Sequence, residues 1–555
     1  MPSSSPPPLD DNPKLDSAAF APPPLLPLDL PTTPPEADLP AAVELKTYVQ
    51  HQSYSPLLSF FRARPFCVAK VFPPSFPGAQ DPFDSSLLSA SLAHVLSAYP
   101  HFAGKLRLAR ADDVGRPYQK RFGRIWVEYG MQNDPGVSFT FLQRDEPVKS
   151  VLPQEVGDRI TDSSVLSQSP FMPDFADVVE LRPSSEERPS LAIRVTRFSD
   201  GAAVIAVLVL HPLADATTLN RFVSDWGDVH RALLLTGSTS SIPLPSRPLS
   251  TETLDAISAG DLDSPFPNPD IEAQHRLLSR LEYDLWARPE LHPPGAVHTS
   301  ALHPAVAAED AARGGERGEP VPWSTCDFAA PTVRRAVELS PEEVQRIWRR
   351  AQASSVVEGG ELVKVTAHDA VVAHFWRLSI RARHLAPTTI VTFGPTISAR
   401  SRLSPSLPPN CVGSPMFLLK TQLRSSDLLS SDGLAIAASS IRRVINTATP
   451  SNIAAILHHT AHQLDPLRIA TAFASSTHIA SSSWIHAGAY NADFGTGAPS
   501  LSRFSSPPVD GLFILDEVAA EAWEGQRWWE RGAVMHFSLR EDVLERMLMD
   551  PELRG

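Results

Sequence analysis

An unbroken apolar run at Val204–Leu210, ended by His211 and Pro212, constrains the fold of this chain more than any other feature. The run is rich in β-branched residues, which is typical of a strand buried on both faces of a sheet. Because proline has no N–H to give to a ladder, we expect the strand to end there. An alternating stretch, Leu191–Phe198, precedes it across a Ser-Asp-Gly turn, so the strand is predicted to be the second arm of a hairpin.

An amphipathic helix is predicted directly after this strand. Apolar residues recur at helical spacing from Leu219 to Trp226, and the helix is expected to continue to about Leu235. Asp215 stands where the helix begins and is predicted to cap it. His211 therefore lies at a strand end, four residues before a helix start, which is a rigid place to hold a catalytic base. The His-x-x-x-Asp spacing is weak by itself, because a core histidine followed by a capping aspartate gives the same pattern.

The composition excludes several classes of function. The chain has 555 residues, of which 42% are hydrophobic, enough for two or more cores. Its net charge of −13 creates no basic field, so we predict no nucleic-acid partner. No apolar run reaches the length of a membrane span, and residues 1–14 lack the pattern of a secretory signal. The three scattered cysteines favour a reducing compartment, and we expect a cytoplasmic monomer.

Changes in composition divide the chain into four parts. Residues 1–42 are rich in proline and are predicted to form an extended, disordered tail. Residues 43–235 and 334–555 carry alternating strand and helix patterns, and each is expected to be a mixed α/β domain. Residues 236–333 form a long crossover with many prolines, in which only Ile271–Ala287 has a helical pattern.

Several stretches together resemble the BAHD family of acyl-CoA-dependent acyltransferases, in the branch that includes fungal trichothecene O-acetyltransferases. His211–Asp215 matches the HxxxD motif of that family, and Asp493–Gly497 resembles its DFGWG motif. Three further stretches resemble the early helix, the second-half helix and the arginine-bearing loop of the family; they are Ser91–Arg107, Ala367–Arg383 and Ile397–Pro408. The resemblance extends over roughly residues 45 to 550 in the order of the family, which a single motif could not do.

The resemblance implies two chloramphenicol-acetyltransferase-like domains with mixed sheets, joined by the long crossover and separated by a channel. It implies an acyltransferase of secondary metabolism that moves an acyl group, acetyl in the first instance, from acyl-CoA to a small-molecule hydroxyl or amine. His211 would be the general base, because an imidazole with a pKa near 6.5 suits proton transfer at neutral pH. No metal and no covalent acyl-enzyme are implied.

The resemblance also implies that the remaining motif residues hold the structure around His211. Asp215 is expected to turn away from the substrate and to pair with an arginine, Arg400 in the first place and Arg402 in the second. The DFGTG positions are expected to be structural, with glycines that permit a tight turn near the channel; they are Asp493, Gly495 and Gly497. Fold maintenance and substrate contact both remain open for these positions, and the CoA-contacting residues cannot be read from the sequence.

Three departures from the family pattern, and one difference from a related fold, bear on alternative functions. Thr496 replaces the usual Trp of DFGWG, while Ser398 and Ser414 stand where many members have other polar residues. Leu210 precedes His211, whereas condensation domains usually carry a second histidine there, which argues against a condensation-type domain. The missing Trp and the long crossover keep open a catalytically silent member that acts as a binding or scaffold protein.

Two rival sites are weaker. His458 and His462 share a helix face with His459 nearby, but no Glu follows the first histidine and no third ligand is evident, so we predict no zinc site. Ser481–Ser483 lacks a Gly-x-Ser-x-Gly elbow, which argues against a serine hydrolase.

Overall fold

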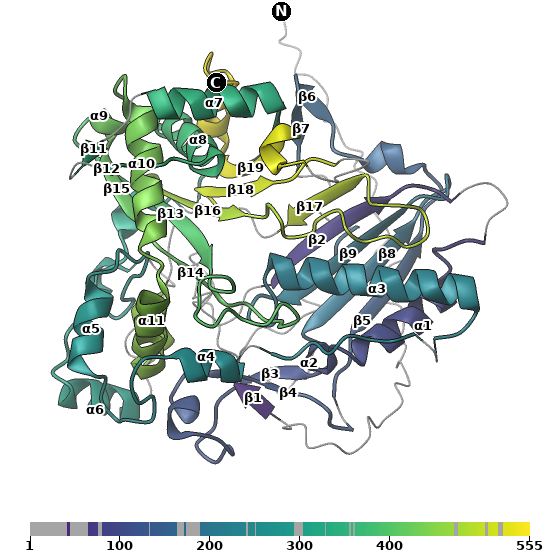
Figure 1. The fold of residues 1–555 in the computed structure, drawn as a ribbon, viewed down its shortest axis with the longest axis horizontal. Coiled ribbons are helices and arrows are strands. Elements are labelled where there is room, and N and C mark those ends of the chain that lie inside the picture. Colours follow the sequence, from purple (N-terminus) through teal and green to yellow (C-terminus); the bar gives the residue numbers. More distant parts are fainter. Residues whose placement is uncertain are drawn as a thin grey trace, which may run out of the picture.

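The computed structural model describes part of the chain, and the predicted proline-rich tail lies almost wholly outside that part. The described residues are 42–44, 65–75, 80–132, 134–163, 171–173, 189–239, 242–249, 251–292, 304–327, 329–353, 357–358, 361–470, 475–505, 509–519 and 526–555. They form a mixed α/β architecture with two large sheets and helices packed on each (Figure 1). Among these residues, no helix is both long and apolar enough to cross a membrane.

The first sheet has β9 at its centre, and all eight side chains of that strand are buried. Its strand order is β17-β2-β9-β8-β5, with bounds Leu501–Ser505, Pro65–Phe72, Ala203–Leu210, Leu191–Arg197 and Ser138–Gln143. β9 pairs antiparallel with both β2 and β8, which confirms the predicted buried strand and hairpin. β5 pairs parallel with β8, so the sheet is mixed.

Helix α3 (Ala216–Thr236) follows β9 and packs against α1 (Ser85–Leu96) beside this sheet (Figure 1). The Asp215 carboxylate accepts a hydrogen bond from the Thr218 N–H at 3.0 Å, and the helix ends at a glycine in the left-handed conformation. The Trp226 indole donates to Ser91 on α1 at 2.9 Å. The predicted helix and its cap are therefore confirmed.

The second sheet has the order β14-β13-β16-β18-β19-β10-β7-β6, with β15 also paired to β13. In that order the bounds are Met416–Leu418, Ile390–Ser398, His478–Ser483, Leu512–Asp516, Ala533–Arg540, Thr332–Leu339, Ile160–Asp162 and Glu155–Gly157, and β15 is Thr421–Arg424. The β13–β16 and β16–β18 pairs are parallel and the others are antiparallel. Helices α7 (Pro341–Ala353), α8 (Ala367–Arg383), α10 (Gly433–Asn446) and α12 (Glu541–Leu548) lie on this half of the molecule (Figure 1).

The two sheets exchange strands across the predicted domain boundaries. β17, from the C-terminal half of the chain, pairs with β2 in the first sheet. β7, from the N-terminal half, pairs with β10 in the second sheet, and β6 follows it. Each sheet is therefore completed by the opposite half of the chain, and the boundaries at 235 and 334 stay predictions.

The crossover contains more helix than its sequence pattern indicated. It carries α4 (Thr251–Ile257), α5 (Pro269–Arg276) and α6 (Pro304–Ala312). The predicted helix over Ile271–Ala287 is wrong beyond Arg276, because Arg280 and Tyr283 make bridges to strand-like segments of the C-terminal half. Tertiary pairing thus overrides the local helical pattern.

The remaining elements are short, apart from α11, which packs against α5. They are β1 (Ala42–Glu44), α2 (Pro100–Ala103), β3 (Lys105–Leu108), β4 (Ile125–Glu128), β11 (Val357–Glu358), β12 (Glu361–Leu362), α9 (Ser425–Leu428) and α11 (Pro450–His462).

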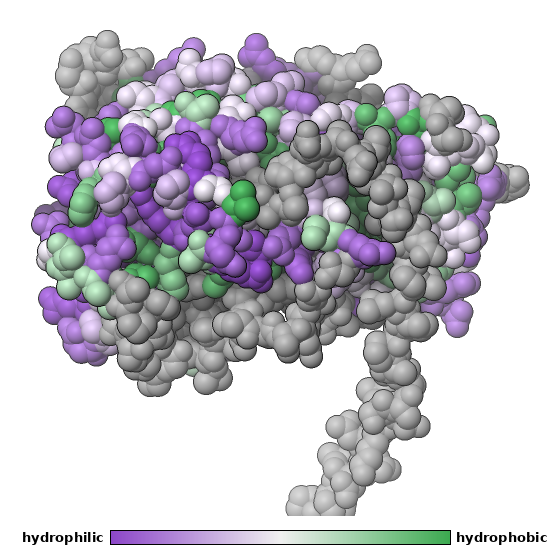
Figure 2. Space-filling view, turned by 90° about the horizontal axis from the view of Figure 1, so that it is seen from below, coloured by the Kyte–Doolittle hydropathy of each residue, from purple (hydrophilic) through white to green (hydrophobic). Residues whose placement is uncertain are grey.

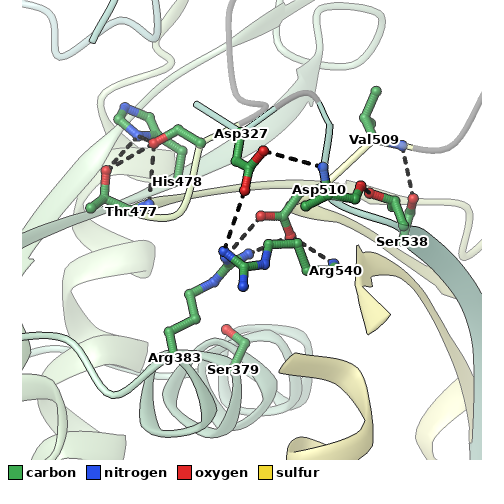
Figure 3. A network of polar contacts seen from close by, with 12 residues as sticks. Asp327, Ser379, Arg383, Thr477, His478, Val509, Asp510, Ser538 and Arg540 are labelled. Carbon is green, nitrogen blue, oxygen red and sulfur yellow. Dashed lines mark hydrogen bonds and ion pairs between the residues drawn. The ribbon is translucent and has the colours of Figure 1, made fainter. Parts of the chain in front are cut away.

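A buried ion pair fixes α8 beneath the second sheet. Arg383 at the end of α8 donates to both carboxylate oxygens of Asp510, at 2.8 and 2.6 Å, and the two side chains are 2% and 8% exposed (Figure 3). The same carboxylate accepts from the Arg540 backbone N–H at the end of β19. One carboxylate therefore joins a helix, a strand end and the loop that leads into β18.

We predict that Arg383→Ala lowers the free energy of unfolding by about 3–5 kcal/mol, because it leaves the buried Asp510 charge unpaired. Urea unfolding of the purified chain measures this. The matched control is Asp228→Ala, which breaks an exposed pair with Arg231 at 2.8 Å and is expected to cost less than about 1 kcal/mol. Equal losses for the two variants would contradict the importance of burial here.

Candidate active site

His211 lies in the turn that directly follows β9, where the sequence predicted it. The Leu213 N–H donates to the Leu210 carbonyl at 2.9 Å and closes the turn. Residues 203–210 are buried, whereas His211 keeps partial exposure to solvent. The rigid strand therefore ends by presenting an imidazole where solvent reaches the residue.

A cluster of three aromatic side chains reaches this imidazole through Phe66. The Phe66 ring, on β2, has its centroid 4.6 Å from that of His211. Trp484 and Phe504 complete the group, with centroids 5.3 Å apart and each 6.4 Å from Phe66. We call these three residues the aromatic wall. The sequence analysis missed this wall because its members come from three distant segments and share no spacing.

The second half of the chain supplies a polar neighbour to the histidine. The Ser414 hydroxyl lies 3.3 Å from His211 Nδ1, and Ser414 itself is buried. Burial lowers the pKa of His211 below its usual 6.5, and the nearby Asp215 charge opposes this shift only in part. The imidazole is therefore neutral at pH 7 and can accept a proton.

Asp215 turns toward Arg400, the first of the two arginines that the sequence nominated. Arg400 donates to both oxygens of the carboxylate, and its Nη2 also donates to the Thr218 hydroxyl and to the Gly413 carbonyl, each at 2.9 Å. The Asp215 N–H and the Thr218 hydroxyl donate to the same Gly413 carbonyl, at 3.3 and 2.7 Å. Arg402 instead points to the Ile445 carbonyl, at 3.4 Å. The turn that holds His211 is thus tied to the loop that carries Ser414.

The DFGTG segment lies away from His211. The Phe494 ring packs on Phe72 and Trp226, with centroids 5.1 and 4.9 Å away, and Phe72 pairs with Ala203 at the start of β9. Since His211 follows the other end of β9, a full strand of eight residues, roughly 25 Å at 3.3 Å per residue, separates the two motifs.

The segment is a tight turn anchored on α3. Asp493 Oδ1 accepts from the N–H groups of Gly495 and Gly497, at 2.7 and 2.9 Å, and Oδ2 pairs with Arg231 of α3 at 3.2 Å. Both glycines have positive φ, +100° and +91°, which favours glycine at these positions. These contacts dock the turn on α3. The structure does not bring Asp493, Gly495 or Gly497 together with His211.

Two buried ionisable side chains, Lys70 of the first sheet and Asp516 of the second, were not found from the sequence. Lys70 of β2 donates to the Ala489 carbonyl and, at 3.3 Å, to Ser502. Burial lowers the pKa of Lys70 to about 7, against the opposing charge of Asp516 on β18. Burial likewise raises the pKa of Asp516 to about 6. Lys70 gives little sequence signal because it stands within an otherwise apolar strand.

The chain is similar to known acyltransferases in sequence and to TRI101 in fold. The model of the Transferase family matches residues 78–244 and 323–523. The chain is 24% identical to Acyltransferase AFT15-1 of Alternaria alternata, over 84% of this chain and 86% of that protein. It is 23% identical to Agmatine hydroxycinnamoyltransferase 1 of Oryza sativa subsp. japonica, over 78% and 80% of the two chains. TRI101 of F. sporotrichioides, solved with coenzyme A and T-2, has a TM-score of 0.57 at 17% identity, covering 92% of this chain and 98% of that one.

The chain therefore belongs to the Transferase family, the BAHD acyltransferases, and is an acyltransferase. The structural similarity also confirms the predicted chloramphenicol-acetyltransferase-like fold with two sheet-rich domains.

We predict that Asp215→Ala lowers the free energy of unfolding by about 1–3 kcal/mol, because it leaves the Arg400 guanidinium without its carboxylate and removes the cap of α3. Asp215→Asn is expected to lose less, since its amide oxygen can still cap the helix. Thermal and urea unfolding of the three proteins measure the difference. An Asp215→Ala protein that unfolds like the wild type would refute the pairing as a stabilising contact.

Proposed function

We propose that the protein transfers an acyl group from acyl-CoA to a small-molecule hydroxyl or amine, with His211 as the general base. The observation that carries the proposal is a neutral imidazole at the end of a rigid buried strand, on a residue that solvent still reaches. The family membership supports acyl transfer, and the coenzyme A in the solved TRI101 complex supports a CoA thioester as the donor. Acetyl-CoA is the donor we propose first.

The contacts of the imidazole support different roles for its two nitrogens. If Nδ1–H donates to the Ser414 hydroxyl, the lone pair of Nε2 is free for the acceptor. Nε2 then takes the proton of the acceptor as its oxygen or nitrogen attacks the thioester carbonyl. The tetrahedral intermediate collapses, the C–S bond breaks, and the CoA thiolate leaves and takes up the proton held by Nε2, which returns the imidazole to its neutral form.

The Asp215–Arg400 pair supports an orienting role rather than a catalytic one. Both carboxylate oxygens of Asp215 accept hydrogen bonds from the Arg400 guanidinium, so the carboxylate holds the turn and does not face the substrate. We likewise propose Ser414 as a positioning residue for the imidazole. Asp493, Gly495 and Gly497 are proposed to maintain the fold, because their contacts run to one another and to α3.

The relatives, rather than the aromatic wall, bear on the acceptor. Phe66 and Trp484 are 3% and 4% exposed, so they belong to the core beside the imidazole and offer little surface to a substrate. The relatives compared above differ in their acceptors, since one is named for agmatine, an amine, and a solved neighbour was crystallised with T-2. A test panel therefore needs both alcohols and amines.

We predict that wild-type protein releases free thiol from acetyl-CoA only when an acceptor from such a panel is present. His211→Ala should lower this acceptor-dependent rate by about 10²–10⁴-fold, since that is the usual contribution of a general base. Unfolding midpoints and circular dichroism verify that the variant is folded. A folded His211→Ala protein with the wild-type rate would refute the general-base role. A wild-type protein that is inactive with every donor and acceptor would instead favour a binding protein.

The pH profile gives a second prediction. The base must be neutral to accept a proton, and burial lowers the pKa of His211, so kcat/KM should fall only as the pH drops through a value below 6.5. At pH values above this pKa, kcat/KM should no longer depend on the protonation of His211. A limb centred well above 6.5 would contradict a desolvated imidazole as the base.

A further inference from the structure

Residues of the crossover and of α11 line a cavity of about 1040 Å³. Helices α5, α6 and α11 lie in the lower left of Figure 1. Residues of these helices contribute to the wall of the cavity, which shares no lining residue with the His211 site described above. The side of the molecule seen in Figure 2 carries gathered hydrophilic residues toward its left. The cavity therefore needs an explanation separate from acyl transfer at His211.

Three metal-ligating side chains converge on the wall of this cavity. Glu272 and His275 stand three residues apart on α5, a Glu-x-x-His pair on one helix face, and His459 comes from the adjacent α11. Each offers one ligand atom, and these atoms all lie within 4.8 Å of one another. Among the described residues, this is the group of His, Cys, Asp and Glu side chains that has such geometry.

The two imidazoles differ in how fully they are hydrogen-bonded. Their rings stack, with centroids 3.7 Å apart and 10° between their planes, so one ring must turn before both can bind the same ion in their ring planes. His459 is paired at both ring nitrogens, Nδ1 with Glu272 at 2.8 Å and Nε2 with Gln463 at 2.9 Å, and the Gln463 contact is the one that a metal ion would replace. His275 is only 7% exposed, and its Nε2 has no hydrogen-bond partner; the nearest carboxylate oxygen, from Glu282, is 3.8 Å away. A buried imidazole nitrogen without a partner is costly, and it points to a ligand.

The Glu272 carboxylate resembles His275 in having one buried atom without a hydrogen-bond partner. One oxygen of Glu272 accepts a hydrogen bond from His459 Nδ1 at 2.8 Å, whereas Oε1 is buried without a partner.

The arginines that line the cavity do not leave it with a large positive charge. Arg280 donates to Glu282, and Arg468 pairs with Asp310 at 3.0 Å and with Asp284 at 3.4 Å. Acidic partners therefore neutralise these two arginines.

We infer that Glu272, His275 and His459 form a binding site for one divalent transition-metal ion of the Zn²⁺ class. Two imidazoles and one carboxylate are a set that such ions prefer, with further coordination positions open toward the cavity. Bound there, the ion cross-links α5 of the crossover to α11 of the C-terminal half. The sequence pattern shows no third ligand near His458 and His462, because the partners of His459 lie more than 180 residues earlier in the chain.

The test uses the full chain stripped with a chelator, reloaded with Zn²⁺ and passed through gel filtration, with metal content measured by mass spectrometry. We expect one Zn²⁺ per chain, and we expect Co²⁺ to give visible absorption bands in its place. His275→Asn and His459→Asn should each weaken binding by more than about tenfold, because even the loss of an outer partner of a metal ligand has that effect.

His486→Asn is the matched control, since that side chain is 74% exposed and lies outside the cluster. It should bind Zn²⁺ like the wild type, and unfolding midpoints without metal show whether each variant is folded. Binding that is absent, or that survives both cluster variants, overturns the site and leaves the His459–Glu272 hydrogen bond as a purely structural contact. Because the readout is metal content, failure of this proposal is distinguishable from failure of acyl transfer at His211.

Discussion

The ion pair between Asp215 and Arg400 is the contact on which the geometry of the candidate site depends. It joins the turn after β9 to the loop before β14, and the Gly413 carbonyl at its centre accepts hydrogen bonds from three groups of that junction. The same loop carries Ser414 to His211 Nδ1. A bidentate pair fixes both distance and angle, so it aligns two segments that lie 185 residues apart.

Local sequence predicted the elements on which this junction stands. The apolar run of β9, the helical stripe of α3 and the capping role of Asp215 each follow from the pattern of neighbouring residues, and the structure bears them out. Such signals are strong because burial on both faces and helix capping depend on residues close in sequence. The contact of Asp215 with Arg400, by contrast, was nominated from a family resemblance and not from the residues alone.

What the sequence did not predict depends on distant segments. The aromatic wall combines β2, the segment after β16 and β17, and β17 itself crosses into the first sheet from the far half of the chain. The end of α5 is set by pairing of the crossover with the C-terminal half, which no local pattern records. The Glu272–His275–His459 cluster has the same origin, since one helix supplies only part of the ligand set.

A double-mutant cycle on Asp215 and Arg400, read out as kcat/KM for acyl transfer, tests the central claim most directly. If the pair aims His211 as one unit, Asp215→Ala and Arg400→Ala each reduce kcat/KM, and the double variant is no worse than the poorer single variant. Losses that simply multiply would mean that the two residues act independently, and the account of how the imidazole is held would be contradicted.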